Sequence, residues 1–262
     1  MQRREFLGTT CLAGAAALGA MATPAGAGEP GKKQILELKR YALEAGDMRA
    51  RCEKFLAEAA VPAWNRLGSK PVGVFGFADG KSADLYVLVP HDSAEAFVTA
   101  PAKLWADADF VKAGEPFINP PKETPTYNRV STWVLLGFDA CPRVAAPTKK
   151  ETRLFQMRTY PSYSDAKARK KREMFNTGGE LALFLKLGMA PVFFGEALAG
   201  SVMPNLTYML VFDDEAAQKA AWDKFQASDE WKKLKDDPQY ADTVIGPSIV
   251  NEVLKPLACS QI

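Results

Sequence analysis

The chain has 262 residues, of which 47% are hydrophobic and 24% are charged, and its formal net charge is +2 at pH 7. This composition is typical of a globular protein with one large or two small domains, and it excludes a chain that is mainly disordered. A charge this close to neutral predicts no nucleic-acid partner.

Residues 1–27 read as a secretory leader. Arg3 and Arg4 precede a weakly hydrophobic run, and an Ala25-Gly26-Ala27 cleavage pattern follows it. We expect a twin-arginine signal that is removed after export, which predicts a periplasmic or extracellular protein. The alternative is a chance Arg pair in a general secretory leader. The apolar run from Leu7 to Ala22 is too short for a membrane span, so no stable membrane anchor is expected.

The first strand predicted after the leader covers Ile35–Leu43, where apolar and polar residues alternate. A helix is expected over residues 48–60, and Pro62 is expected to kink or restart it. Two strands, "PVGVFGF" and "DLYVLVP", come next. A second helix is expected to begin at Asp92, which forms a capping box with Glu95, and the strand "NRVSTWVLLGF" closes the unit.

The same pattern then returns about 120 residues later. Tyr41 aligns with Tyr160 at an offset of 119, Gly68 with Gly188 at 120, and Asp84 with Asn205 at 121. A helix is expected from Asp165 to Phe175, ended by two glycines, and another near Asp213 to Glu215. The repeat predicts units at 32–138 and 152–258, joined by a linker at 139–151.

Each unit reads βαββαβ, which predicts the α+β class and two tandem ferredoxin-like repeats. One such sheet leaves a face uncovered, so we expect the two sheets to pack face to face as a dimeric α/β barrel within one chain. The apolar face should then lie under the helices (Leu36, Leu38, Phe155 and Met157). The polar face should point into the barrel (Glu37, Lys39, Tyr41, Gln156, Arg158 and Tyr160). The alternative is a polar face exposed to solvent.

The first-strand patterns Glu37-Leu38-Lys39-Arg40-Tyr41 and Gln156-Met157-Arg158-Thr159-Tyr160 resemble those of the NIPSNAP family. The segments "PAWNRLGSKPVGVF", "EMFNTGGELALFLKLGMAPVFFGE", "PNLTYMLVFDD" and the final "SQI" share this resemblance, which extends over essentially the whole mature chain and is closest to the bacterial secreted two-repeat branch. Lys39 and Gln156 stand where Arg and Glu are more typical. The resemblance implies the barrel fold, and it implies no particular activity, because NIPSNAP proteins have no well-established enzymatic activity. Barrel relatives include cofactor-free monooxygenases, haem-dependent enzymes and isomerases, so analogy alone does not choose among these activities.

On the polar face, Arg158 and Tyr160 are the anchors expected for a carboxylate or an enolate-like oxygen. The other expected ligand-binding residues are Lys39, Tyr41, Gln156, Asn205 and Tyr208. Glu196 and Glu37 are the candidate general bases of an enzyme. The alternative is structural: Arg158 pairs with Glu37 or Glu196 and fills the barrel.

Metal and thiol chemistry have little support in the sequence. His91 is the one histidine and no CxxC motif occurs, which excludes an ordinary zinc site and a Ser-His-Asp triad. No cofactor is predicted, and haem held through His91 is the alternative. Cys141 and Cys259 either form a disulfide or stay separate thiols. Cys52 is expected to be a free thiol under both alternatives.

Three functions remain open. The first is a barrel that binds a small, partly apolar or anionic molecule. The second is a cofactor-independent monooxygenase or isomerase that uses a barrel carboxylate with Arg158 and Tyr160. The third is a protein-interaction module whose barrel is filled. Because one chain supplies both halves of the barrel, we expect a monomer or a weak dimer.

Overall fold

The computed structural model describes residues 32–240 and 249–262. The leader expected at 1–27 lies outside the described residues. Within them, the two repeats have the same order of elements. The first contains β1 (Ile35–Ala42), α1 (Asp47–Phe55), η1 (Leu56–Ala60), α2 (Val61–Arg66), β2 (Gly73–Phe77), β3 (Leu85–His91), α3 (Ala94–Ala106), α4 (Ala108–Ile118) and β4 (Arg129–Gly137).

The second repeat follows the same plan. Its elements are β5 (Leu154–Pro161), α5 (Asp165–Asn176), α6 (Glu180–Lys186), β6 (Ala190–Ala199), β7 (Asn205–Phe212), α7 (Glu215–Ala227), α8 (Asp229–Asp236) and β8 (Val250–Pro256). Helices α3 and α7 have equal length and stand 121 residues apart at both ends. The expected α+β fold of two tandem repeats is confirmed.

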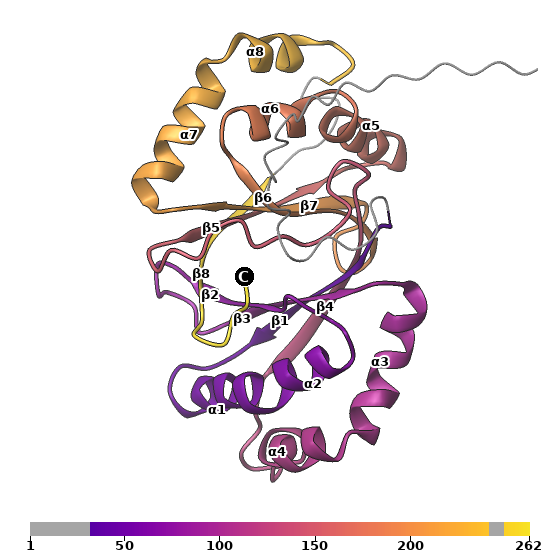
Figure 1. The fold of residues 1–262 in the computed structure, drawn as a ribbon, viewed down its shortest axis with the longest axis vertical. Coiled ribbons are helices and arrows are strands. Elements are labelled where there is room, and N and C mark those ends of the chain that lie inside the picture. Colours follow the sequence, from indigo (N-terminus) through magenta and orange to yellow (C-terminus); the bar gives the residue numbers. More distant parts are fainter. Residues whose placement is uncertain (1–31, 241–248) are drawn as a thin grey trace, which may run out of the picture. The chain divides into compact units, whose positions relative to one another are not determined.

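The strands form a closed barrel in the order β1-β3-β2-β8-β5-β7-β6-β4. Each repeat contributes four neighbouring strands in the ferredoxin-like order, and antiparallel pairs between β2 and β8 and between β4 and β6 join the two sheets. The helices of each repeat cover the outer face of its own sheet, as Figure 1 shows. The expected dimeric α/β barrel within one chain is therefore confirmed.

The helix boundaries follow local chemistry, with one correction. The Ser93 hydroxyl, not Asp92, caps α3 by accepting a hydrogen bond from the N–H of Ala96. Asp92 instead accepts hydrogen bonds from Gln34 and Arg143. The first helix continues through a π-helical turn into α2, and Pro62 lies in the first turn of α2.

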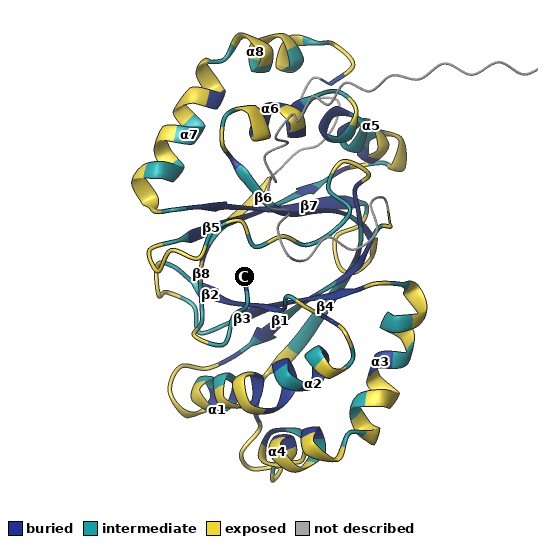
Figure 2. Ribbon diagram, viewed as in Figure 1, coloured by how far each residue is buried: buried dark blue, intermediate teal, exposed yellow. Residues whose placement is uncertain are grey.

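The barrel interior is apolar, which reverses the predicted orientation of the two strand faces. One hydrophobic cluster takes a residue from every strand of both repeats, which is possible only inside the barrel: Leu36, Phe75, Leu88, Leu135, Phe155, Phe193, Met209 and Leu254. The same cluster includes Leu38 and Met157. The residues predicted to lie under the helices thus fill the barrel, and Figure 2 shows that β3 and β7 are buried along their length.

The opposite strand faces lie under the helices. Tyr41 packs into a cluster with the α1, η1, α2 and α4 residues of its own repeat, and Tyr160 into one with α5, α6 and α7. The prediction that the polar face points into the barrel was therefore wrong. Alternation shows that two faces differ, but both faces are covered here, so it could not show which one forms the barrel core.

Two further predictions concern a disulfide and a membrane anchor. Cys52, Cys141 and Cys259 are separate thiols, so the structure has no disulfide between Cys141 and Cys259. Burial raises the pKa of the Cys141 thiol to about 11. In residues 32–240 and 249–262, no helix is long and apolar enough to cross a membrane.

Candidate functional site

A buried polar network lies on the outer face of the first sheet. Glu37 on β1 accepts a hydrogen bond from His91 Nε2 at 3.1 Å and pairs with the ammonium of Lys39, two residues along the strand. Ser69 Oγ lies 3.3 Å from His91 Nδ1. Since an ionised carboxylate can only accept, His91 Nε2 carries the proton that it donates to Glu37.

This network keeps Glu37 ionised. Burial alone would raise the pKa of Glu37, but the hydrogen bond from His91 and the charge of Lys39 outweigh it, so the pKa lies below its usual value. His91 itself is buried, and its ring forms an edge-to-face contact with Phe97 in which the ring centroids are 5.4 Å apart. The serine and histidine lie beneath the protein surface, so this arrangement orients Glu37 and does not present a nucleophile.

A hollow of about 500 Å³ opens above this network. Its floor is formed by Glu37, Lys39 and Tyr41. Its walls are apolar and come from five helical segments: Phe55, Ala60, Trp64, Phe97, Val98, Ala100, Pro101, Leu104, Trp105 and Phe110. The Lys39 side chain keeps 20% of its surface exposed there. A few polar groups at the base of an apolar hollow of this size are typical of a small-molecule site.

The corresponding face of the second repeat is closed. Trp222 on α7 donates its indole N–H to Gln156 Oε1, and Gln218 donates to the same oxygen at 3.1 Å. The Trp222 ring also covers Arg158, whose guanidinium carbon lies 4.9 Å from the ring centroid. Arg158 donates to Tyr208 Oη at 3.3 Å and stacks on Tyr160.

Burial shapes the titration of this closed cluster. It raises the pKa of Tyr208 to about 12 and the pKa of Tyr160 well above its usual value. Burial alone would lower the pKa of Arg158, but the two tyrosines outweigh it and the pKa is raised. Arg158 pairs with neither Glu37 nor Glu196, the partners that the structural alternative proposed.

Two differences between the repeats, both on the helix that covers the sheet, account for one face being open and the other closed. The equal helices α3 and α7 place Pro101 at the position of Trp222 and Phe97 at the position of Gln218. In the first repeat the short Pro101 ring leaves empty the space that the indole occupies in the second. Alignment of the two repeats reveals the exchange of Trp222 for Pro101, so the sequence contained the evidence for the hollow. The alternation pattern of a single strand does not reveal this exchange.

The remaining predicted residues lie apart from the hollow. Glu196 on β6 forms an ion pair with Arg172 at 3.2 Å in a separate surface cleft. Asn205 begins β7 and donates to the carbonyl of Val202. The structure thus brings together Glu37, Lys39 and Tyr41 in one site, and Gln156, Arg158, Tyr160 and Tyr208 in another.

The sequence did not identify His91 and Ser69 as partners of Glu37, because residues from β1, β3 and the turn before β2 meet only in the folded sheet. Both ring nitrogens of His91 are engaged in this network. Over the part of the chain that the structure describes, no group of three or more His, Cys, Asp or Glu side chains could hold a metal ion.

Solved structures of low identity share the fold. A candidate monooxygenase from Lactobacillus acidophilus NCFM is 12% identical, with a TM-score of 0.58 over 86% of this chain and 94% of the other. One from Fusobacterium nucleatum subsp. nucleatum ATCC 25586 is 8% identical, with a TM-score of 0.56 over 86% and 93%. An anthrone oxidase-like protein is 11% identical, with a TM-score of 0.53 over 86% and 92%.

No curated protein sequence matches this chain. The family model of NIPSNAP matches residues 36–124 and again residues 155–261, which together make up most of the sequence. The first match extends from β1 to α4, and the second from β5 to β8. This chain therefore belongs to the NIPSNAP family.

Proposed function

We infer that the protein binds a small, mostly apolar molecule in the hollow above Glu37 and Lys39, and that Lys39 recognises an oxygen acceptor on that molecule. The observation that carries this inference is the open space left by Pro101 where the equivalent Trp222 seals the second repeat. The proposal keeps the ligand class expected from the sequence, a partly apolar or anionic molecule. It moves the ligand from the barrel interior to the space beneath α3.

Lys39 suits this role because of its surroundings. An ammonium group has three N–H donors, and Glu37 takes up one of them. The others can meet a carboxylate, sulfonate or carbonyl oxygen, while the aromatic walls contribute apolar contact. Burial of an apolar body in such walls supplies about 25 cal/mol per Å² of area removed from water.

The geometry favours binding over catalysis. Glu37 is a weaker base than an ordinary carboxylate, because His91 and Lys39 stabilise its charged form. Glu196 lies in a different cleft, and Trp222 covers Arg158. The monooxygenase or isomerase alternative with Arg158 and Tyr160 would therefore need α7 to move, whereas binding beneath α3 needs no rearrangement.

The test uses 8-anilinonaphthalene-1-sulfonate, an apolar fluorescent anion. We expect saturable binding at one site, loss of that binding in Pro101→Trp, and about tenfold weaker binding in Lys39→Met. Lys103→Trp is the matched control, because Lys103 lies on the same helix at an exposed position that does not line the hollow. Wild-type affinity in folded Pro101→Trp would contradict the proposal.

Two proposals concern the state of the protein in the cell. The Arg3-Arg4 leader supports export by the twin-arginine route, and replacing both arginines with lysine should retain the protein in the cytoplasm on fractionation. Closure of the barrel by one chain supports a monomer or weak dimer. Analytical ultracentrifugation showing an obligate dimer would contradict the second proposal.

A further inference from the structure

A second hollow, of about 150 Å³, opens at one end of the barrel interior. It is separate from the hollow beneath α3, because its walls come from the inner strand faces. Its lining includes Leu38, Arg40, Tyr86, Trp133, Met157 and Glu252. A dry apolar cavity of about 150 Å³ takes up benzene, so this space fits one aromatic ring.

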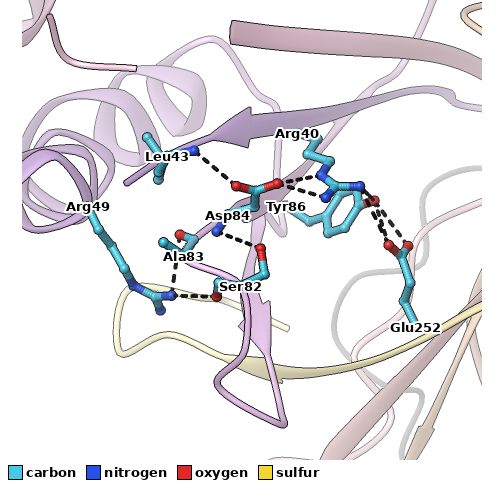
Figure 3. Close-up of polar contacts among 8 residues, drawn as sticks. All are labelled: Arg40, Leu43, Arg49, Ser82, Ala83, Asp84, Tyr86 and Glu252. Carbon is cyan, nitrogen blue, oxygen red and sulfur yellow. Dashed lines mark hydrogen bonds and ion pairs between the residues drawn. The ribbon is translucent and has the colours of Figure 1, made fainter. Parts of the chain in front are cut away.

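Charged and hydroxyl groups meet at one wall of this hollow, as Figure 3 shows. Arg40 is held by Asp84, which accepts from its Nε at 2.8 Å and from Nη2 at 2.7 Å. Tyr86 donates its hydroxyl to Glu252, lying 3.1 and 3.0 Å from the two carboxylate oxygens. Arg40 Nη1 lies 3.7 Å from Glu252, with Tyr86 between the two side chains.

The hollow exists because the two repeats differ at matching positions. Strand register pairs Arg40 with Tyr86 in the first repeat and Thr159 with Thr207 in the second. Two small threonines of the second repeat therefore occupy the positions that match the arginine and the tyrosine of the first repeat. Register also makes Trp133 and Glu252 equivalent, as the partners of Leu38 and Met157. Trp133 supplies an aromatic wall of the hollow, and Glu252 supplies a carboxylate.

The polar wall offers an acceptor and a donor side by side. Each Glu252 oxygen has two lone pairs, and the Tyr86 hydroxyl supplies a single proton to the pair of oxygens. Among the residues that the structure describes, Arg40 Nη1 has two polar contacts, and both are long: 3.4 Å to the Tyr86 hydroxyl and 3.7 Å to Glu252. A ligand hydroxyl could donate to the carboxylate and accept from the guanidinium, and its ring would lie against Leu38, Trp133 and Met157.

We propose that this end of the barrel is a second ligand site, and that it takes a small neutral phenol whose hydroxyl lies between Glu252 and Arg40. The hydroxyl distinguishes the ligand from a plain hydrocarbon ring, which would leave both polar groups without a new partner. Neutrality distinguishes it from an aromatic carboxylate, whose charge Glu252 and Asp84 would repel. The site is independent of the function proposed for the hollow beneath α3.

The experiment is a ¹⁹F NMR titration of the full chain with 4-fluorophenol, fluorobenzene and 4-fluorobenzoate at pH 7. We expect 4-fluorophenol to bind about tenfold more tightly than fluorobenzene and 4-fluorobenzoate to bind least. Glu252→Gln should weaken 4-fluorophenol about tenfold and leave fluorobenzene unchanged. Equal affinities for the three probes would overturn the assignment of the polar wall.

Two filling variants locate the binding. Thr207→Tyr gives the second repeat the residue that the first carries at the matching position, and it should abolish 4-fluorophenol binding. Thr159→Leu is a smaller filling change that should weaken binding if Thr207→Tyr does not fold. Pro101→Trp should leave 4-fluorophenol binding unchanged. Loss of binding in Pro101→Trp, or wild-type binding in both filling variants, would overturn the proposal.

Discussion

Trp222 lies against Arg158, whose guanidinium carbon is 4.9 Å from the centroid of the indole ring. In the first repeat, Pro101 holds the equivalent position above Lys39. The same duplicated fold thus keeps one cationic side chain under an aromatic cover and leaves the other at the floor of a hollow. This difference follows from the helix positions at which the repeats differ, Pro101 against Trp222 and Phe97 against Gln218. The second repeat can therefore serve as an internal control in experiments on the hollow of the first repeat.

Removing the cover should open the second repeat. Trp222 packs against Phe184 and Phe225 besides Arg158, so we expect Trp222→Ala to lower the free energy of unfolding by about 3 kcal/mol. Urea unfolding measures this change. Added indole should raise the melting temperature of the variant more than that of the wild type, because it refills the space. An equal response of the two proteins would show that α7 has collapsed onto the sheet.

The ionised state of Glu37 should make stability depend on pH. Its folded pKa is depressed below the unfolded value of about 4.5, so its contribution is present above that value and is lost as pH falls through the folded pKa. We therefore expect the stability gap between wild type and Glu37→Gln to be largest near pH 7 and to shrink below pH 4.5. Urea unfolding across pH 3.5–7 measures it, with exposed Glu44→Gln as the control. A gap that is constant over this range would contradict the assigned network.

The fold could be predicted from the sequence because the repeat offset is nearly constant from strand to strand, and each unit has the βαββαβ order. The grouping of Glu37, Lys39 and Tyr41 on one strand face was also predictable from alternation. The side on which that face lies was not, because Leu36 and Leu38 meet a second apolar layer from the other repeat. His91 reaches Glu37 only through the pairing of β1 with β3, which strand patterns alone do not place.

A buried ion pair in the second repeat should behave differently in single and double variants. Lys171 lies 3.7 Å from Glu180, both side chains are almost fully buried, and the ammonium also lies 5.0 Å from the Tyr160 ring centroid. Lys171→Met should lower the free energy of unfolding by about 3 kcal/mol, since it removes the ammonium group that forms the buried ion pair with Glu180. Adding Glu180→Leu should recover most of that loss. A double variant no more stable than the single one would show that packing, not charge, holds this region.

The seam between β4 and β6 depends on a close approach that only glycine permits. Gly195 faces Gly137 across the seam, and a Cβ added to Gly195 would lie 2.8 Å from the Leu135 Cβ in the barrel core. We expect Gly195→Ala to lower the free energy of unfolding by about 1–3 kcal/mol, because Leu135 must leave its packed position. Hydrogen exchange should show faster exchange in β4 and β6 than in β1 and β5. An equal increase in exchange rate in all strands would show that the barrel unfolds as one unit and that the variant does not act locally at this seam.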